Sequence, residues 1–475
     1  ELPAVTRELE TLQRQARQAL TDVGIDPDAQ NELSSSVDIS LDRILSRQVA
    51  RRCIYGIDLN LMAVELARLA IWIRTFVPGL PMASLGQRLV HGNALIGFTQ
   101  MSDVLEIISP DERKARTNDG HSGEAYSLAH NLLLERITSA ANDFRRLGMA
   151  SEGTIAEIHA ARTEYQTIWE ELHQVRNLFD FALAVSLGLE KPRPFLDEGS
   201  LHVTPSEDAA DRLNSLSPVH LPVTFPEVMT RKRPGFDVVL GNPPWDKVKV
   251  EEHTWWTIRI PGLRSMKQGE MNAAIARARE TRPDLAAAYD REKKEVAAQA
   301  EVLKKSKYPI GSGDTDLYKI FLWRDWDILR REGRIGVVAP RAALSGSGTE
   351  PWRREILTNG SFEDLCVVVN NSNWVFDGVD VRYTVAFITA ERGDGDRVRF
   401  HGPYRNPSQF KGLQSGEEDT AIDISEKEFR SWSPSLIVPF FQSNEVAELF
   451  MVTHRQPSFF NAPATRNFRF VTELH

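Results

Sequence analysis

Phe236-Asp237-Val238-Val239-Leu240-Gly241-Asn242-Pro243-Pro244-Trp245 is the stretch around which we interpret the rest of the chain. The short run from Val238 to Leu240 is apolar and β-branched, and turn-forming residues follow it. This pattern predicts a buried strand that ends in a rigid loop. An alternative is a plain Pro-Pro turn at the end of a strand.

The loop residues have the chemistry to hold a planar ligand that bears an NH2 group. The side-chain oxygen of Asn242 can accept one amino hydrogen, and the carbonyl of Pro243 can accept the other. Pro243 and Pro244 fix the direction of the chain, because proline locks its own φ and restricts the residue before it. Trp245 can stack on the flat face of a base. We therefore predict that these four residues are the catalytic loop.

Composition indicates an ordinary soluble protein. The chain has 475 residues, 41% hydrophobic and 26% charged, enough for two to four domains. No apolar run is long enough for a membrane span, and no signal peptide is evident, so we expect a cytoplasmic protein. Cys53 and Cys366 both adjoin apolar runs and are predicted to be buried thiols. Without a CxxC or HExxH motif, no metal site is expected.

The net charge of −9 argues mildly against a nucleic-acid partner. A base-modifying enzyme needs only a local basic cleft, however. Arg231-Lys232-Arg233 could supply one, although a solvated loop explains this cluster equally well.

Two strand ends are candidates for a nucleotide site. Residues 53–58, Cys-Ile-Tyr-Gly-Ile-Asp, are predicted to be a strand, and a helix that carries Ala63, Leu66 and Ile71 follows. An acidic residue at such a strand end can bind both hydroxyls of a ribose, which makes Asp58 a candidate. Asp58 could equally be a helix N-cap. The second strand, within residues 89–95, leads to Asn93, which is the other candidate for the nucleotide site. The alternative is a plain turn at Asn93.

Together these segments resemble a known family. The stretches CIYGIDLNLMAVELARLAIWI, LVHGNALIGF, FDVVLGNPPW, TDLYKIFLWRDWDILRREGRIGVVAP and NWVFDGVDVRYTVAFITA follow one another as in large N6-adenine DNA methylases. The likeness is to type IIG restriction-modification methylases and to methylases of BREX-like phage defence. It covers roughly residues 35 to 400, and NPPW resembles the motif IV of amino-methyltransferases that use S-adenosylmethionine.

The resemblance implies a fold, a reaction and partners. The implied fold is α/β, a Rossmann-like methyltransferase sheet with helical insertions. The implied reaction is methyl transfer from S-adenosylmethionine to the N6 of a flipped adenine in double-stranded DNA, with other defence subunits as further partners. Asp58, Leu59, Asn93 and Ala94 would bind the cofactor. The base would stack on Trp245 and on Phe376, with Trp374 as second choice and a plain core aromatic as the alternative.

One departure from the family pattern stands out. The Gly-rich loop (D)PxxGxG, which holds the methionine end of the cofactor in the family, does not precede Tyr55. We expect that the sequence starts downstream of this loop; a defective cofactor site is the alternative. Gly311-Ser312-Gly313 lies on the wrong side of NPPW and is not assigned to the cofactor. The loop's absence also leaves open a non-catalytic DNA-binding or assembly subunit. A further alternative is a methyltransferase that acts on RNA or on protein amides, as related NPP(Y/W) enzymes do.

We expect four parts along the chain. They are the cofactor half (1–100), a helical insertion (101–230), the catalytic half with a helical arm at 250–310 (231–400), and a linker toward a target-recognition domain (401–475). Residues 128–147 and 155–187 have helical periodicity, whereas the proline-rich residues 196–230 are predicted to be extended. Pro283-Asp284 with Glu292-Lys293-Lys294 faintly resembles a nuclease motif, but the context is helical.

Overall fold

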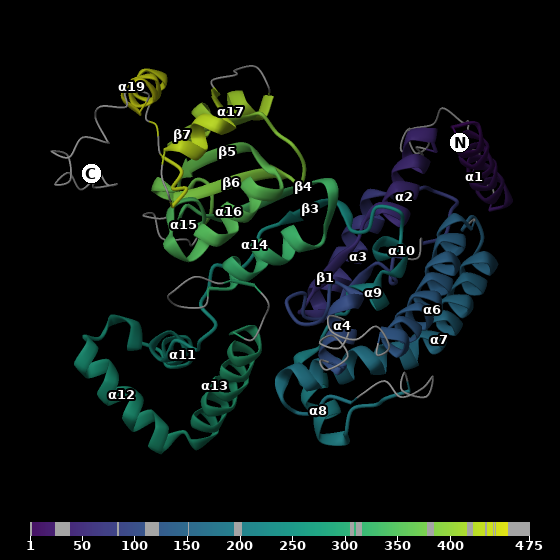
Figure 1. The fold of residues 1–475 in the computed structure, drawn as a ribbon, viewed down its shortest axis with the longest axis horizontal. Helices are drawn as coiled ribbons and strands as arrows, with labels where there is room; N and C mark the ends of the chain where they lie inside the picture. The colour runs from purple at the N-terminus through teal and green to yellow at the C-terminus, as the bar shows by residue number, and fades with distance from the viewer. Residues whose placement is uncertain are drawn as a thin grey trace. The chain divides into compact units, whose positions relative to one another are not determined.

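The computed structural model describes residues 2–23, 39–82, 85–109, 123–150, 152–193, 202–304, 308–309, 316–377, 384–415, 421–432, 435–439, 441 and 443–454. The chain forms two compact units, Glu1–Pro234 and Gly235–His475 (Figure 1). The Gly311-Ser312-Gly313 segment, which we did not assign to the cofactor, lies outside the described residues.

The first unit is mainly helical. Its elements are α1 (Leu2–Asp22), α2 (Leu41–Cys53), β1 (Gly56–Asp58), α3 (Leu61–Arg74), β2 (Leu89–His91), α4 (Met101–Ile108), α6 (Gly123–Met149), α7 (Ile155–Leu187), α8 (Glu207–Leu216), α9 (Leu221–Thr224) and α10 (Pro226–Met229). Figure 1 shows α6 and α7 side by side along their length, within the predicted helical insertion. A continuous core joins them with α4.

Local sequence signals explain where the long helix α7 begins and ends. At its start, the Thr154 hydroxyl accepts from the Glu157 N–H, and the Glu157 carboxylate accepts from the Thr154 N–H. This capping box satisfies N–H groups that the first helical turn leaves without partners. At its end, Gly188 adopts the left-handed conformation with φ 78°, which glycine reaches at little cost. The periodicity of residues 155–187 thus predicted the helix correctly.

The strands of the first unit are shorter than the sequence predicts. Cys53 belongs to the end of α2, so the predicted strand at 53–58 is reduced to β1. Cys53 is also exposed, which contradicts the predicted buried thiol. β1 pairs in parallel with β2, from Gly56 opposite Leu89 to Asp58 opposite His91. Among the fourteen residues of α3, all of which the structure describes, Val64 alone is buried.

The expectation of an extended segment at 196–230 is wrong for its described part. Residues 207–229 contain α8, α9 and α10. Pro222 lies at the second position of α9 and Pro226 at the first of α10. Proline is tolerated in the first helical turn, where no partner for its missing N–H is needed. The prolines therefore begin short helices here.

The second unit is built on one mixed sheet. Its strand order is β3 (Phe236–Gly241), β4 (Leu329–Pro340), β6 (Thr384–Glu391), β5 (Ser361–Val369), β7 (Arg397–Tyr404) and β8 (Ile422–Ser425). β3 and β4 are parallel, and so are β5 and β7, whereas β6 is antiparallel to both of its neighbours. Helix α14 (Leu317–Asp327) connects β3 to β4 as a parallel crossover.

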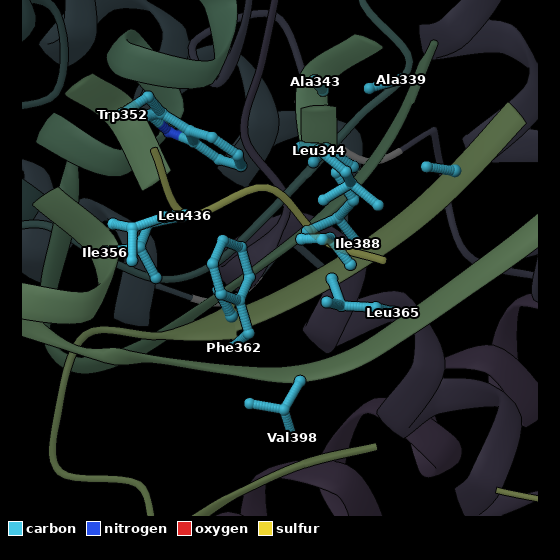
Figure 2. Close-up of a cluster of buried hydrophobic side chains, with 14 of the residues drawn as sticks. Ala339, Ala343, Leu344, Trp352, Ile356, Phe362, Leu365, Ile388, Val398 and Leu436 are labelled. Atoms are coloured by element: carbon cyan, nitrogen blue, oxygen red, sulfur yellow. The ribbon is translucent and has the colours of Figure 1, made fainter. Parts of the chain in front are cut away.

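Helices cover both faces of this sheet to different extents. One face packs against α14, α15 (Ala342–Ser345), α16 (Glu350–Asn359), α18 (Glu426–Ser431) and α19 (Asn444–His454). Figure 2 shows the centre of this core, where Trp352, Ile356 and Leu344 meet side chains of the strands. The other face carries a smaller cluster, to which Phe410 of α17 (Pro407–Ser415) contributes.

The strand before NPPW is exposed, contrary to the predicted buried strand. Val238 is 56% exposed and Leu240 is 79% exposed. Among the described strands, β3 pairs with β4 alone, so it forms an edge of the sheet. The apolar run thus predicted the strand correctly but not its burial, because a hydrophobic run does not reveal whether both faces of the strand are covered.

The described residues between 401 and 454 are not the linker that we expected. β7 and β8 extend the sheet, and Phe429, Phe441 and Ala447 are buried in its larger core. In Arg397–Tyr404 polar and apolar residues alternate only from Arg397 to Phe400, and the following His401-Gly402-Pro403 breaks the pattern, which hid this strand in the sequence.

The predicted helical arm is present as α11 (Glu252–Arg259), α12 (Gln268–Thr281) and α13 (Pro283–Lys304), around a small core of its own. The faint nuclease motif lies within α13, where Asp284 pairs with Arg282 and Glu292 accepts from the Trp255 indole. None of the helices in the described ranges combines the length and apolar character that a membrane span requires.

Candidate active site

The Asn-Pro-Pro-Trp loop leaves the sheet at the carboxyl end of β3. Asn242 and Pro244 are exposed, Pro243 is buried and Trp245 is half-buried. The next residues attach the loop to α14, since the Leu317 N–H donates to the Asp246 carbonyl at 3.0 Å. The loop therefore presents the amide of Asn242 outward, while its proline and its aromatic ring are packed against the protein.

A buried carboxyl group lies beneath the start of this loop. Asp325 of α14 is 8% exposed, and its Oδ2 would lie 3.3 Å from a Cβ built on Gly241. Burial raises the pKa of Asp325 to about 7, and the nearby charge of Arg324 only partly offsets this effect. The sequence gives no sign of Asp325 as a site residue, because it occurs among apolar and charged residues of a helix whose inner face is not evident from the pattern.

The two predicted stacking aromatics lie together in the second unit. The ring centroids of Trp245 and Phe376 are 6.1 Å apart, and the ring planes meet at 81°. Both rings are half-buried and pack against the smaller core of the sheet. Trp374 packs against the same core, and its indole donates to the Val369 carbonyl at 2.8 Å. The structure thus places Phe376, the first choice, against the NPPW ring.

Charged residues at the start of α14 are paired with one another. Lys319 Nζ lies 2.7 Å from Asp316 Oδ2, and both side chains are largely buried. The backbones of Lys247 and Asp316 form an isolated antiparallel β-bridge, which holds the chain after Trp245 against the start of α14. Tyr318 is buried in the larger core, where desolvation raises its pKa to about 12. Asp316 and Lys319 therefore support the loop, whereas Tyr318 is a core residue.

The candidate cofactor residues lie together at the strand ends of the first unit. Asp58 is the last residue of β1 and Leu59 follows it, and His91 at the end of β2 donates to the Leu59 carbonyl at 3.0 Å. Asp58 Oδ1 accepts from the Asn60 N–H at 2.7 Å, and Asn60 itself caps α3. Asp58 is exposed and is not the cap residue, so its second carboxylate oxygen faces outward from this turn.

Asn93 and Ala94 follow β2 at the same edge of this sheet, and both are half-buried. Asn93 Oδ1 accepts from the Leu95 N–H at 3.0 Å, and the Asn93 N–H donates to the Ser217 carbonyl at 2.7 Å. The Asn93 side-chain oxygen therefore closes a turn, as the alternative interpretation proposed, and its amide nitrogen remains as a donor.

The glycine before Asn93 is required by close packing. A Cβ on Gly92 would lie 2.4 Å from the Val219 side chain and 3.2 Å from the Ser217 carbonyl. Only glycine allows the segment after β2 to approach residues 217–219 this closely. The Gly-Asn pair of the sequence therefore marks a defined local structure rather than a variable turn.

The Arg231-Lys232-Arg233 cluster occurs at the end of the first unit. Lys232 and Arg233 are exposed, and Arg231 Nε donates to the Arg233 carbonyl at 3.0 Å. This arrangement is a solvated loop that presents positive charge, and its role as a basic cleft for nucleic acid stays a prediction.

In the second unit, a parallel strand of an α/β sheet thus ends in an exposed Asn-Pro-Pro-aromatic loop. The family is given by the sequence. The model of the Eco57I restriction-modification methylase family matches residues 52–273 and 288–376, about two-thirds of the chain. The chain belongs to this family. No curated protein matches it.

Several solved structures are similar to the chain at low identity. A chain of a type I restriction-modification system is 15% identical, with 56% of this chain and 50% of that chain covered and a TM-score of 0.27. The type ISP enzyme LlaGI is 12% identical, with coverages of 91% and 39% and a TM-score of 0.25. The type IIG endonuclease BpuSI is 12% identical, with coverages of 69% and 45% and a TM-score of 0.24. This chain thus spans half or less of these proteins.

Proposed function

We propose that this protein transfers a methyl group from S-adenosylmethionine to the N6 amino group of adenine in double-stranded DNA. The observation that carries the proposal is the second unit's loop, where an exposed Asn242 stands beside the aromatic pair Trp245 and Phe376. Membership of a restriction-modification methylase family supports DNA as the substrate.

The loop residues act on the amino group of the target base. Asn242 Oδ1 accepts one amino hydrogen, and the Pro243 carbonyl oxygen accepts the other. Two acceptors orient the nitrogen and draw its lone pair out of conjugation with the ring, which makes the nitrogen nucleophilic. Buried Pro243 and the attachment of Asp246 to α14 hold these acceptors in place before the base arrives. Positioning and electrostatics therefore supply most of the catalysis.

The residues at the strand ends of the first unit fit the adenosine part of the cofactor. Asp58 is exposed, with one oxygen engaged by the Asn60 N–H and the other available to a ribose hydroxyl. Asn93 keeps its amide nitrogen as a donor for an adenine nitrogen, beside Leu59 and Ala94. Bound S-adenosylmethionine would supply an electrophilic methyl group, and no residue of this protein needs to be alkylated.

The target base has to leave the double helix to reach Asn242. Extrusion costs a few kcal/mol, which stacking on aromatic side chains partly offsets, at about 1–3 kcal/mol per base. Trp245 and Phe376 are the described aromatics beside the loop. Because this proposed site reads the amino edge and the ring face of one base, recognition of the surrounding sequence is assigned to other parts of the protein.

The test is transfer of labelled methyl from S-adenosylmethionine to duplex DNA, followed by digestion and identification of the labelled nucleoside. Asn242→Ala removes one acceptor and is expected to lower the rate by about 10²–10³-fold, as for loss of an oriented polar group at a reacting centre. Asn359→Ala is the matched control, because Asn359 is an exposed asparagine at the end of α16.

Each outcome has a distinct meaning. Label on N6-methyladenine that is lost in Asn242→Ala and kept in Asn359→Ala would support the proposal. Label on cytosine N4 would retain the amino-methyltransferase chemistry and overturn adenine as the target base. Normal turnover by Asn242→Ala would overturn the catalytic loop.

A further inference from the structure

Asn370 is a fully buried asparagine that follows β5, with 0% of its surface exposed. Its Oδ1 accepts from the N–H groups of Val375 and Phe376, both at 3.1 Å. Its Nδ2 donates to the Phe376 carbonyl at 3.2 Å. One side chain thus binds both polar backbone groups of the residue that carries the stacking ring.

The backbone between these residues turns back on itself. Ser372 and Asn373 have φ values of 64° and 57°, in the left-handed region that few residues other than glycine adopt. The Asn373 N–H donates to the Asn370 carbonyl at 3.1 Å, and the Trp374 indole donates to the Val369 carbonyl at 2.8 Å. Residues 370–376 therefore form a closed loop around the Asn370 side chain.

This loop determines which part of Phe376 can move. The Phe376 backbone is fixed through its N–H and its carbonyl, so rearrangement of the residue is restricted to its side-chain torsions. The ring contacts Trp245 edge to face. An asparagine is suited to this role, because an amide offers an acceptor for two N–H groups and a donor for a carbonyl. Aspartate would keep the acceptor, and alanine would leave all three backbone groups without these partners.

We propose that Asn370 is a positioning residue, which holds Phe376 at the height where its ring stacks on the extruded adenine. This inference rests on the proposed function for the identity of the base. Asn370 itself does not contact the substrate. It acts through Phe376, and removal of Asn370 is therefore expected to matter only as long as the ring of Phe376 is present.

The first experiment tests the loop without reference to activity. Hydrogen exchange of the Val375 and Phe376 amides, resolved by fragmentation mass spectrometry, is compared between the wild type and Asn370→Ala. We expect exchange to accelerate about tenfold or more in Asn370→Ala, since the amides lose their acceptor. Equal exchange in the wild type and Asn370→Ala would overturn the inference.

The second experiment is a double-mutant cycle on DNA methylation. Phe376→Leu is expected to lower kcat/KM for DNA by about tenfold or more, the effect of losing one stacking face. Asn370→Ala should cause a comparable loss, and the double variant should be no worse than Phe376→Leu, with the KM for S-adenosylmethionine unchanged in all. Multiplication of the two single losses in the double variant would show that Asn370 acts independently of Phe376 and would overturn the inference.

The two experiments separate the inference from the proposed function. If the wild type transfers no methyl group to DNA, the proposed function fails, and hydrogen exchange still decides whether Asn370 holds Phe376. If methylation proceeds and the cycle shows no coupling, the positioning role fails and the proposed function stands.

Discussion

Replacing Asp325 with asparagine is expected to change how the stability of the second unit depends on pH. Asp325 is buried beneath Gly241, and burial raises its pKa from 3.8 to about 7. A group whose pKa is higher in the folded than in the unfolded state binds protons more tightly when folded. Its stabilising contribution is therefore complete below pH 3.8 and is lost as the pH rises to about 7.

The size of the effect follows from the two pKa values. Each pKa unit is worth about 1.4 kcal/mol, so the full difference corresponds to about 4 kcal/mol in the free energy of unfolding. About 2.5 kcal/mol of this change falls between pH 5 and pH 8. Asparagine carries no charge at any of these values. Asp325→Asn should therefore become progressively more stable than the wild type as the pH is raised.

The assay is urea unfolding at pH 5, 6, 7 and 8, followed by tryptophan fluorescence. Eight of the ten tryptophans lie in the second unit, so this signal reports mainly on the unit that contains Asp325. Asp423→Asn, at an exposed aspartate of β8, controls for the general effect of removing a carboxylate. A difference between the wild type and Asp325→Asn that stays constant from pH 5 to pH 8 would refute the reasoning.

Two further predictions concern stability and thiol reactivity. Arg353 is fully buried and donates to the carbonyls of Ala343, Gly346, Ser435 and Leu436. Arg353→Met leaves these acceptors without this partner, and each buried acceptor without a partner costs about 1–3 kcal/mol. The substitution should therefore lower the free energy of unfolding by about 3 kcal/mol or more. Denaturant unfolding measures this, and a loss below 1 kcal/mol, within the range of surface substitutions, would contradict it. Cys53 is exposed, whereas Cys366 is buried, and burial raises the pKa of the Cys366 thiol to about 12. A thiol reagent should therefore modify only Cys53 in the native protein, and it should modify no cysteine in native Cys53→Ser. Rapid modification of native Cys53→Ser would show that Cys366 is accessible.

Hydrophobic periodicity predicted the elements that depend on local sequence. The helices α6 and α7 were expected within about five residues of their observed bounds. Each has a continuous apolar pattern at one period, and α7 has an explicit capping box besides. The Asn-Pro-Pro-Trp loop was also correctly placed after a strand, because rigid turn residues directly follow a short β-branched run.

Other features depend on contacts that are distant in sequence. β7 and β8 join the sheet through pairing with β5 and with each other, which the sequences of these strands do not signal. Leu240 is exposed because it points, like Val238, to the opposite face of β3 from Val239, which packs against the larger core. The Asn-Asn-Ser-Asn sequence at 370–373 indicates a turn, but nothing in it shows that the first side chain points inward and binds the backbone of Phe376.

The geometry of Trp245 and Phe376 also determines how a base can enter the proposed site. With centroids 6.1 Å apart and planes at 81°, the rings contact each other, and a base cannot lie between them without a rearrangement. Asn370 holds the Phe376 backbone, and Trp245 packs against both cores of the sheet, so rotation of the Phe376 ring is the smallest change that admits the base.

This rotation exchanges one aromatic contact for another. Separation of the two rings loses about 0.5–1.5 kcal/mol, and stacking on the base returns about 1–3 kcal/mol. The net gain of about 1 kcal/mol offsets only part of the few kcal/mol that extrusion of a base costs. On the proposed reaction, the aromatic pair therefore orients an adenine at Asn242 without binding DNA tightly by itself. On the proposed reaction, affinity for DNA and selection of the target sequence must come from contacts outside this pair.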